Sequence, residues 1–147
     1  MEKTLKDVLS DRIDTKVGAI AGLDAAIKAF QNDNGKEKKP ISLDGNKVII
    51  ITNFASIACE LIYPDADTKE LSTAQLIFKT AFDSSGKIYE TFPSDTKIVN
   101  NSKTLLLKKA QVVPFACPQH ILNYEVLALF TDQIVGVTFG SFNRNSN

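Results

Sequence analysis

Apolar side chains recur every three or four residues over residues 4–31, close to the start of the chain. This spacing places them along one stripe of an α-helix, so the pattern predicts a long amphipathic N-terminal helix. The residues of the stripe are Leu5, Leu9, Ile13, Val17, Ile20, Leu23, Ile27 and Phe30. Thr4 and Asp7 resemble a capping box, and Gly35 can supply the left-handed residue that ends a helix.

The opposite side of this helix carries small residues in its second half. They are Gly18, Gly22, Ala25, Ala26 and Ala29. Two glycines inside a helix cost roughly 0.5–1 kcal/mol each, which favours a second close packing contact on that side. A helix that bends near Gly18, with alanines that simply face solvent, explains the same residues. We take the five small residues as a candidate interface.

The rest of the chain divides by composition. Residues 32–41 are polar and end at a proline, which predicts a linker too short to separate two folded domains. Residues 42–142 form a predicted β-rich body, and the polar residues 143–147 are expected to form a flexible tail. A chain of 147 residues fits one domain of ordinary size, so we expect a single domain over residues 1–147.

Alternating apolar positions and short apolar runs predict several strands in the body. The clearest runs are residues 48–52, 105–107, 111–113, 124–130 and 134–142. Alternation over 76–82, a turn at 83–86 and a return at 88–92 predict a β-hairpin. Residues 54–62 fit either a short helix or a strand, and the strand-like segments around them favour the strand.

Strand signals about 10–15 residues apart, joined by turns, are typical of antiparallel sheets. We therefore expect an α+β fold, mostly β, with the N-terminal helix packed on an antiparallel β-sandwich or a strongly curved sheet. The C-terminal third is almost wholly apolar, which predicts central strands buried on both faces. Gly136 and Gly140 interrupt its last strand and indicate a bulge or a close backbone approach.

Composition and charge exclude some classes of protein. Apolar residues make up 44% of the chain and charged residues 23%, which is typical of a globular protein. No apolar run approaches the ~20 residues needed to span a bilayer, and the N-terminus lacks the apolar core of a signal peptide, so we expect a cytoplasmic protein. Lys/Arg and Asp/Glu balance at 17 each, which disfavours nucleic-acid binding.

Two cysteines and one histidine limit metal chemistry. Cys117 and His120 have the CxxH spacing, but structural zinc sites use four ligands and Cys59 could add only a third. Asp65 and Asp67, with a nearby glutamate, could bind a hard cation, although turns favour aspartate anyway. We therefore predict no metal site.

Candidate catalytic groups are equally few. Cys59 and His120 could form a nucleophile pair only if the fold brings them together, and two thiols of a reduced protein are the simpler interpretation. No glycine-rich phosphate loop or serine elbow occurs in the sequence. His120 or Asp132 could act as a base in a pocket between helix and sheet. We assign no catalytic residue and no cofactor.

The shortage of reactive side chains, the balanced charge and the two smooth helix faces favour one function. We expect a non-enzymatic structural or protein-interaction module that self-associates through its N-terminal helix and its β edges. Its partner would be a second copy, in a homo-oligomer, or another protein. The alternative is a small-molecule-binding or enzymatic pocket between the helix and a curved sheet.

Overall fold

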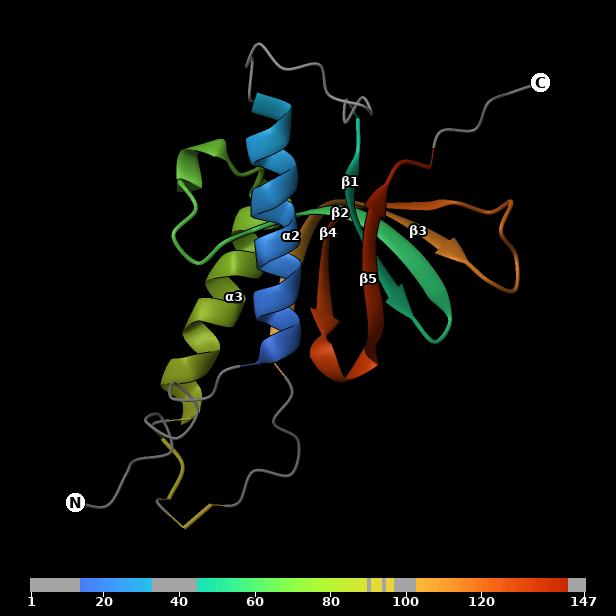
Figure 1. Cartoon of the computed structure of the whole chain (residues 1–147). Helices are drawn as coiled ribbons and strands as arrows, with labels where there is room; N and C mark the ends of the chain where they lie inside the picture. Colours follow the sequence, from blue (N-terminus) through green and yellow to red (C-terminus); the bar gives the residue numbers. More distant parts are fainter. Residues whose placement is uncertain (1–13, 33–44, 90, 94, 97–102, 143–147) are drawn as a thin grey trace.

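The structure is a computed structural model that describes residues 14–32, 45–89, 91–93, 95–96 and 103–142. Its elements follow the chain in this order (Figure 1): α2 (Thr15–Asn32), β1 (Lys47–Thr52), β2 (Ala55–Leu61), η1 (Thr68–Glu70), α3 (Thr73–Tyr89), β3 (Thr104–Pro114), β4 (Leu122–Phe130), η2 (Thr131–Gln133) and β5 (Ile134–Gly140). The two η elements are short 3-10 helices. The predicted α+β class is confirmed.

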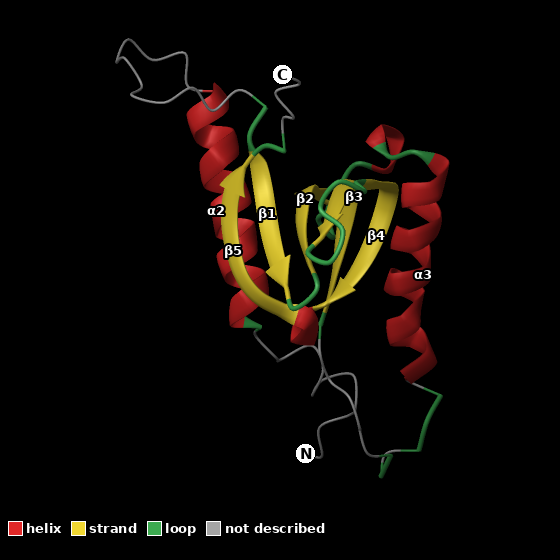
Figure 2. Cartoon of the chain, turned by 90° about the vertical axis from the view of Figure 1, so that its right-hand side faces the viewer, coloured by secondary structure: helices red, strands yellow, loops and turns green. Residues whose placement is uncertain are grey.

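The strands form one antiparallel five-stranded sheet in the order β4-β3-β2-β1-β5. The predicted antiparallel sheet is confirmed, but the described residues contain no second sheet that would make a sandwich. β4 and β5 are the two edges, yet only the three residues of η2 separate them along the chain. The sheet must therefore curve so that the end of β4 approaches the start of β5, and Figure 2 shows the two strands converging there. The sheet is not closed.

The chain between β2 and β3 differs from the prediction. Residues 73–89 form α3, so the β-hairpin predicted over residues 76–92 is wrong. The amide of Gln75 donates to Oγ of Ser72 at 3.3 Å, and the amide of Ser72 donates to Oε1 of Gln75 at 3.1 Å. This reciprocal capping box starts the helix. The more buried positions then follow at helical steps: Gln75, Phe78, Lys79 and Phe82.

Two other strand predictions have opposite outcomes. Residues 55–61 form β2, so the strand interpretation of that segment is confirmed. The buried hydroxyl of Thr52 accepts from the amide of Ala55 and donates to its carbonyl, both at 3.0 Å, which fixes the tight β1–β2 turn. The apolar C-terminal strands, in contrast, are the edges of the sheet and not its centre. That prediction is wrong because an apolar run does not report how many neighbours its strand has.

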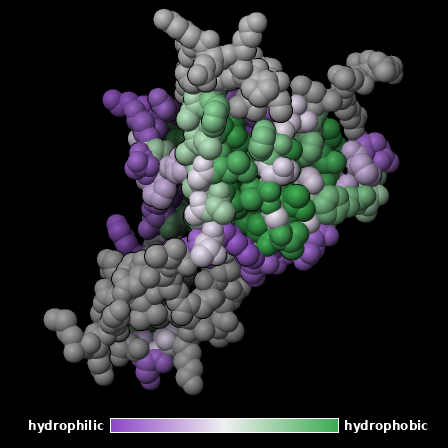
Figure 3. Space-filling model, viewed as in Figure 1, coloured by the Kyte–Doolittle hydropathy of each residue, from purple (hydrophilic) through white to green (hydrophobic). Residues whose placement is uncertain are grey.

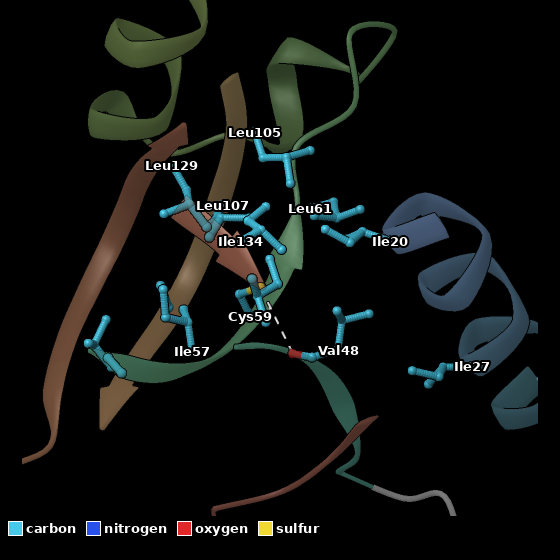
Figure 4. Packing of buried hydrophobic residues seen from close by; sticks show 14 residues of the cluster. Ile20, Ile27, Val48, Ile57, Cys59, Leu61, Leu105, Leu107, Leu129 and Ile134 are labelled. Atoms are coloured by element: carbon cyan, nitrogen blue, oxygen red, sulfur yellow. Dashed lines mark hydrogen bonds between the residues drawn. The ribbon is translucent and has the colours of Figure 1, made fainter. Parts of the chain in front are cut away.

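The main core lies between α2 and the sheet. Ile20 and Ile27 of α2 point towards Leu61 of β2 and Val48 of β1 (Figure 4), and all four are almost inaccessible to solvent. β3, β4 and β5 add further buried residues to the same cluster, including Leu105, Leu107, Leu129 and Ile134. Each fully buried aliphatic side chain stabilises the fold by about 1.5–3 kcal/mol. No residue in the described part of α3 belongs to this cluster.

Some predictions concern residues that the structure does not describe. Residues 4–13 of the predicted helix, most of the linker over 32–41 and the tail over 143–147 lie outside the described ranges. The described helix begins at Thr15 and ends at Asn32. Phe30, the last residue of the predicted stripe, is 57% exposed, so the buried stripe ends about one turn earlier at Ile27.

Candidate functional site

The five small residues predicted as an interface all lie on the exposed side of α2. Gly18, Gly22, Ala25, Ala26 and Ala29 are exposed to solvent. A methyl group added at Gly18 or Gly22 would meet no atom within 4 Å. Within the described ranges no other element covers this side, so the second packing contact favoured by the glycines stays a prediction.

One flank of α2 faces the start of β5. The Nζ of Lys16 donates to the carbonyl oxygens of Thr131 at 3.0 Å and Ile134 at 2.8 Å. Leu23 and Phe30 follow Lys16 at steps of seven residues, which is close to two helical turns, so they share its flank. The start of α2 is thereby fixed to the connection between the two sheet edges.

The other flank of α2 is bound to the segment after β2. The buried carboxylate of Asp24 accepts from the hydroxyl of Tyr63 and, at 2.8 Å, from Nζ of Lys28. The Lys28 ammonium also lies 5.2 Å from the centre of the Tyr63 ring. Burial, followed by the bond to Asp24, raises the pKa of Tyr63, so the phenol stays protonated and remains a donor at neutral pH. This group fixes α2 to the segment that follows β2.

The outer edge of β5 lacks the residues that usually protect an edge strand. Residues 134–140 contain no charged residue and no proline, which are the residues that usually protect an edge strand from pairing. Val135 is 59% exposed and Phe139 46% exposed. Figure 3 shows strongly hydrophobic residues gathered where β5 crosses the front of the sheet. Within the described residues, β5 pairs with β1 alone.

The two glycines of β5 occupy the positions that the sequence marked as irregular. The register against β1 shifts between Ile51 and Thr52, which pair with Gly136 and Ile134 respectively. A methyl group at Gly140 would lie 3.3 Å from Cδ1 of Ile49, closer than most side-chain contacts. The predicted bulge or close approach is therefore confirmed, by a register shift beside Gly136 and a close approach at Gly140.

The outer edge of β4 is treated differently. α3 lies beside this strand, and Nε2 of the buried Gln75 donates to the carbonyl oxygen of Glu125 at 3.3 Å. β4 also carries the exposed side chain of Glu125. A helix and a charge therefore protect this edge, in the way that natural proteins usually protect edge strands.

The residues considered for catalysis do not assemble. His120 and Asp132 are exposed and lie beyond opposite ends of the nine-residue β4, which spans about 30 Å at ~3.3 Å per residue. Cys59 and Cys117 are free thiols. Burial raises the pKa of the Cys59 thiol to about 12, so it is not a thiolate at neutral pH.

Metal-binding groups are also dispersed. In the described part of the chain, no three His, Cys, Asp or Glu side chains lie close enough together to hold a metal ion. The carboxylate of Asp67 instead accepts from the amide of Lys69 at 3.0 Å and caps η1. Asp65 and Asp67 therefore have an ordinary structural place in a turn.

No family model, curated protein or solved structure matches this chain. None of the helices in the described ranges has both the length and the apolar character needed to cross a membrane.

Proposed function

We propose that this protein is a non-enzymatic interaction module that self-associates, with β5 of one copy pairing antiparallel to β5 of a second copy. The observation that carries the proposal is the outer edge of β5, which is uncharged, free of proline and flanked by exposed Val135 and Phe139. An edge of this kind offers backbone donors and acceptors for a further strand.

The sequence of β5 is suited to pairing with itself. When two copies are related by a two-fold axis at Val137, Val135 of each lies opposite Phe139 of the other. A β-branched residue opposite an aromatic residue contributes roughly 0.2–1 kcal/mol, and the symmetry supplies two such pairs. In the same register Gly136 lies opposite Thr138, which leaves the backbone free to approach closely. Identical copies therefore meet without any clash of charges.

The position of α2 supports the same arrangement. A two-fold axis perpendicular to the joined sheets keeps both α2 helices on one side of them. The flank of α2 that faces β5 contains Leu23 and the half-exposed Phe30, with Ala26 beside them. Apolar and small residues on this flank allow the two helices to approach each other, so the helix would add apolar contact to the strand pairing.

Val135→Lys tests the strand pairing directly. A charge on an edge strand opposes pairing with a second strand, so we expect a wild-type dimer to become a monomer. Light scattering after size exclusion and analytical ultracentrifugation measure the mass. Ile77→Lys is the matched control, because Ile77 is 62% exposed on α3 and the same charge is added away from β5. A wild-type monomer at about 100 μM would contradict the proposal, since useful self-association has a micromolar or tighter Kd.

Gly22→Leu separates the contribution of the helix from that of the strand. Space around Gly22 is open and leucine favours a helix more than glycine does, so the larger side chain should raise the free energy of unfolding by roughly 0.5–1 kcal/mol. We expect a shift towards monomer if the small-residue side of α2 takes part in assembly. An unchanged dimer would remove that side of α2 from the interface and leave the β5 pairing in place.

A further inference from the structure

A groove of about 340 Å³ opens on the sheet, and none of its lining residues belongs to β5. It is lined by residues of β1, β3 and β4, among them Lys47, Lys109, Gln111, Asn123 and Tyr124. All of its lining residues come from strands, so it differs from the pocket between helix and sheet considered for the alternative function. Its volume lies at the lower end of the range of small-molecule sites.

Three lysines converge on one carboxylate beside this groove. The ammonium groups of Lys47 and Lys109 lie 3.7 Å from Oε1 of Glu60, and that of Lys108 lies 4.0 Å from Oε2. Direct ammonium–carboxylate hydrogen bonds are shorter, at about 2.7–2.9 Å. Glu60 thus holds the three ammonium groups near one another without a close bond to any of them. The four side chains together leave a surplus of two positive charges.

A backbone irregularity brings two consecutive lysines to the same carboxylate. Neighbouring residues of a regular strand point to opposite faces, so only one of them would reach Glu60. The register between β2 and β3 shifts between Ala58 and Glu60, where Lys109 and Ala110 together lie opposite one residue of β2. Lys109 has φ of 50°, in the left-handed region that glycine adopts most easily. Bulges of this kind commonly redirect a side chain at a binding site.

We propose that the groove binds a small phosphate monoester, with its phosphate beside the ammonium groups of Lys47, Lys108 and Lys109. A phosphate monoester carries about −1.5 to −2 charges at neutral pH, opposite in sign to the surplus around Glu60. The amide side chains of Gln111 and Asn123 line the groove and supply donors and acceptors for the organic part. The exposed carboxylate of Glu125 lies at the same groove, where it can accept from a ligand hydroxyl.

The test uses glycerol 3-phosphate and inorganic phosphate as probes, titrated into the full-length protein at low salt and followed by calorimetry and NMR. We expect glycerol 3-phosphate to bind, and Lys47→Met to weaken its affinity about tenfold or more. Lys109→Gly should weaken it similarly. Glycine suits the left-handed backbone, so this variant keeps its fold while it loses the ammonium group. Lys87→Met, which removes an exposed charge from α3, is the control and should bind as the wild type does.

Three outcomes would overturn the proposal. The first is no binding of either probe by the wild type up to about 10 mM, a range in which weak phosphate sites are occupied. The second is an equal loss of affinity in Lys87→Met, which would indicate a general charge effect. The third is binding to vesicles that contain phosphatidic acid but not to soluble glycerol 3-phosphate, which would assign the lysines to a membrane headgroup. Because Val135 does not line the groove, Val135→Lys should bind the probe normally.

Discussion

β4 and β5 end the same sheet, but the described residues protect only β4 along its outer edge. α3 lies beside β4, Gln75 bonds to its backbone and Glu125 adds a charge. β5 has only apolar residues, glycine and threonine, and Val135 and Phe139 are half exposed. In the described part of this fold, therefore, protection against pairing with a further strand is found at the β4 edge and not at the β5 edge. The unprotected side is where a second strand can be added with least cost.

The inner residues of the two edges show no such difference. Leu129 of β4 is 6% exposed and Ile134 of β5 is 4% exposed, and both belong to the main core. β4 also exposes apolar side chains, at Leu122, Tyr124 and Phe130. The contrast between the edges therefore lies in the charge and the helix at β4, and not in how firmly each strand is anchored.

Ile134→Ala and Leu129→Ala should have the largest effects on stability. Each removes a buried aliphatic group and leaves a cavity, so we expect each to lower the free energy of unfolding by about 2–5 kcal/mol. Urea denaturation followed by circular dichroism measures the loss. Val135→Ala, on the exposed side of β5, should cost less than about 0.5 kcal/mol. A small loss of unfolding free energy for Ile134→Ala, beside a large loss for Leu129→Ala, would contradict the equal anchoring of the two edges. β5 would then be only loosely attached to the core.

Gln75→Ala should have the next largest effect, since it removes the side-chain half of the capping box, which accepts from the amide of Ser72, together with the bond to β4. We expect a loss of about 1–3 kcal/mol in the free energy of unfolding. Weaker attachment of α3 would also uncover the β4 edge, so this variant should form species larger than the wild type in size exclusion. Gln133→Ala, at an exposed residue of η2, controls for loss of a glutamine amide. If Gln75→Ala destabilises the fold without any change of mass, the helix cap is its main role.

Glu125→Val should have the smallest effect. The residue is exposed, so the free energy of unfolding should change by less than about 0.5 kcal/mol. The mass in solution should also stay the same, because α3 still covers the edge after the charge is removed. Larger assemblies of Glu125→Val would show that the charge, and not the helix, protects β4.

Much of the fold could be predicted from local patterns. The helical spacing of Val17, Ile20 and Ile27 and the turns between strands identified α2 and most of the sheet. α3 was missed because Leu76, Phe78, Thr80 and Phe82 alternate as a strand does, although they also fit a helix. The reciprocal pair of Ser72 and Gln75 was the signal that could have decided for the helix.

The candidate sites were harder to foresee. The small residues of α2 could be found from the sequence, but the order of strands in the sheet could not, and so β5 was taken for a central strand. The lysines beside Glu60 come from β1 and β3, which are brought together only by the fold. The left-handed backbone at Lys109 has no local signal, because lysine is not a residue that usually adopts it.

The strand order also has a consequence for how the chain folds. β5 pairs with β1, although more than 80 residues separate the paired positions Thr52 and Ile134. During synthesis β1 is made before β5, and its outer edge stays without its final neighbour until β5 has left the ribosome. β1 contains Val48, Ile49 and Ile50, which are all apolar and are buried in the finished sheet. β5 thus covers the outer edge of an aggregation-prone strand only late in synthesis. The long-range pairing of β5 with β1 should therefore limit the rate of folding.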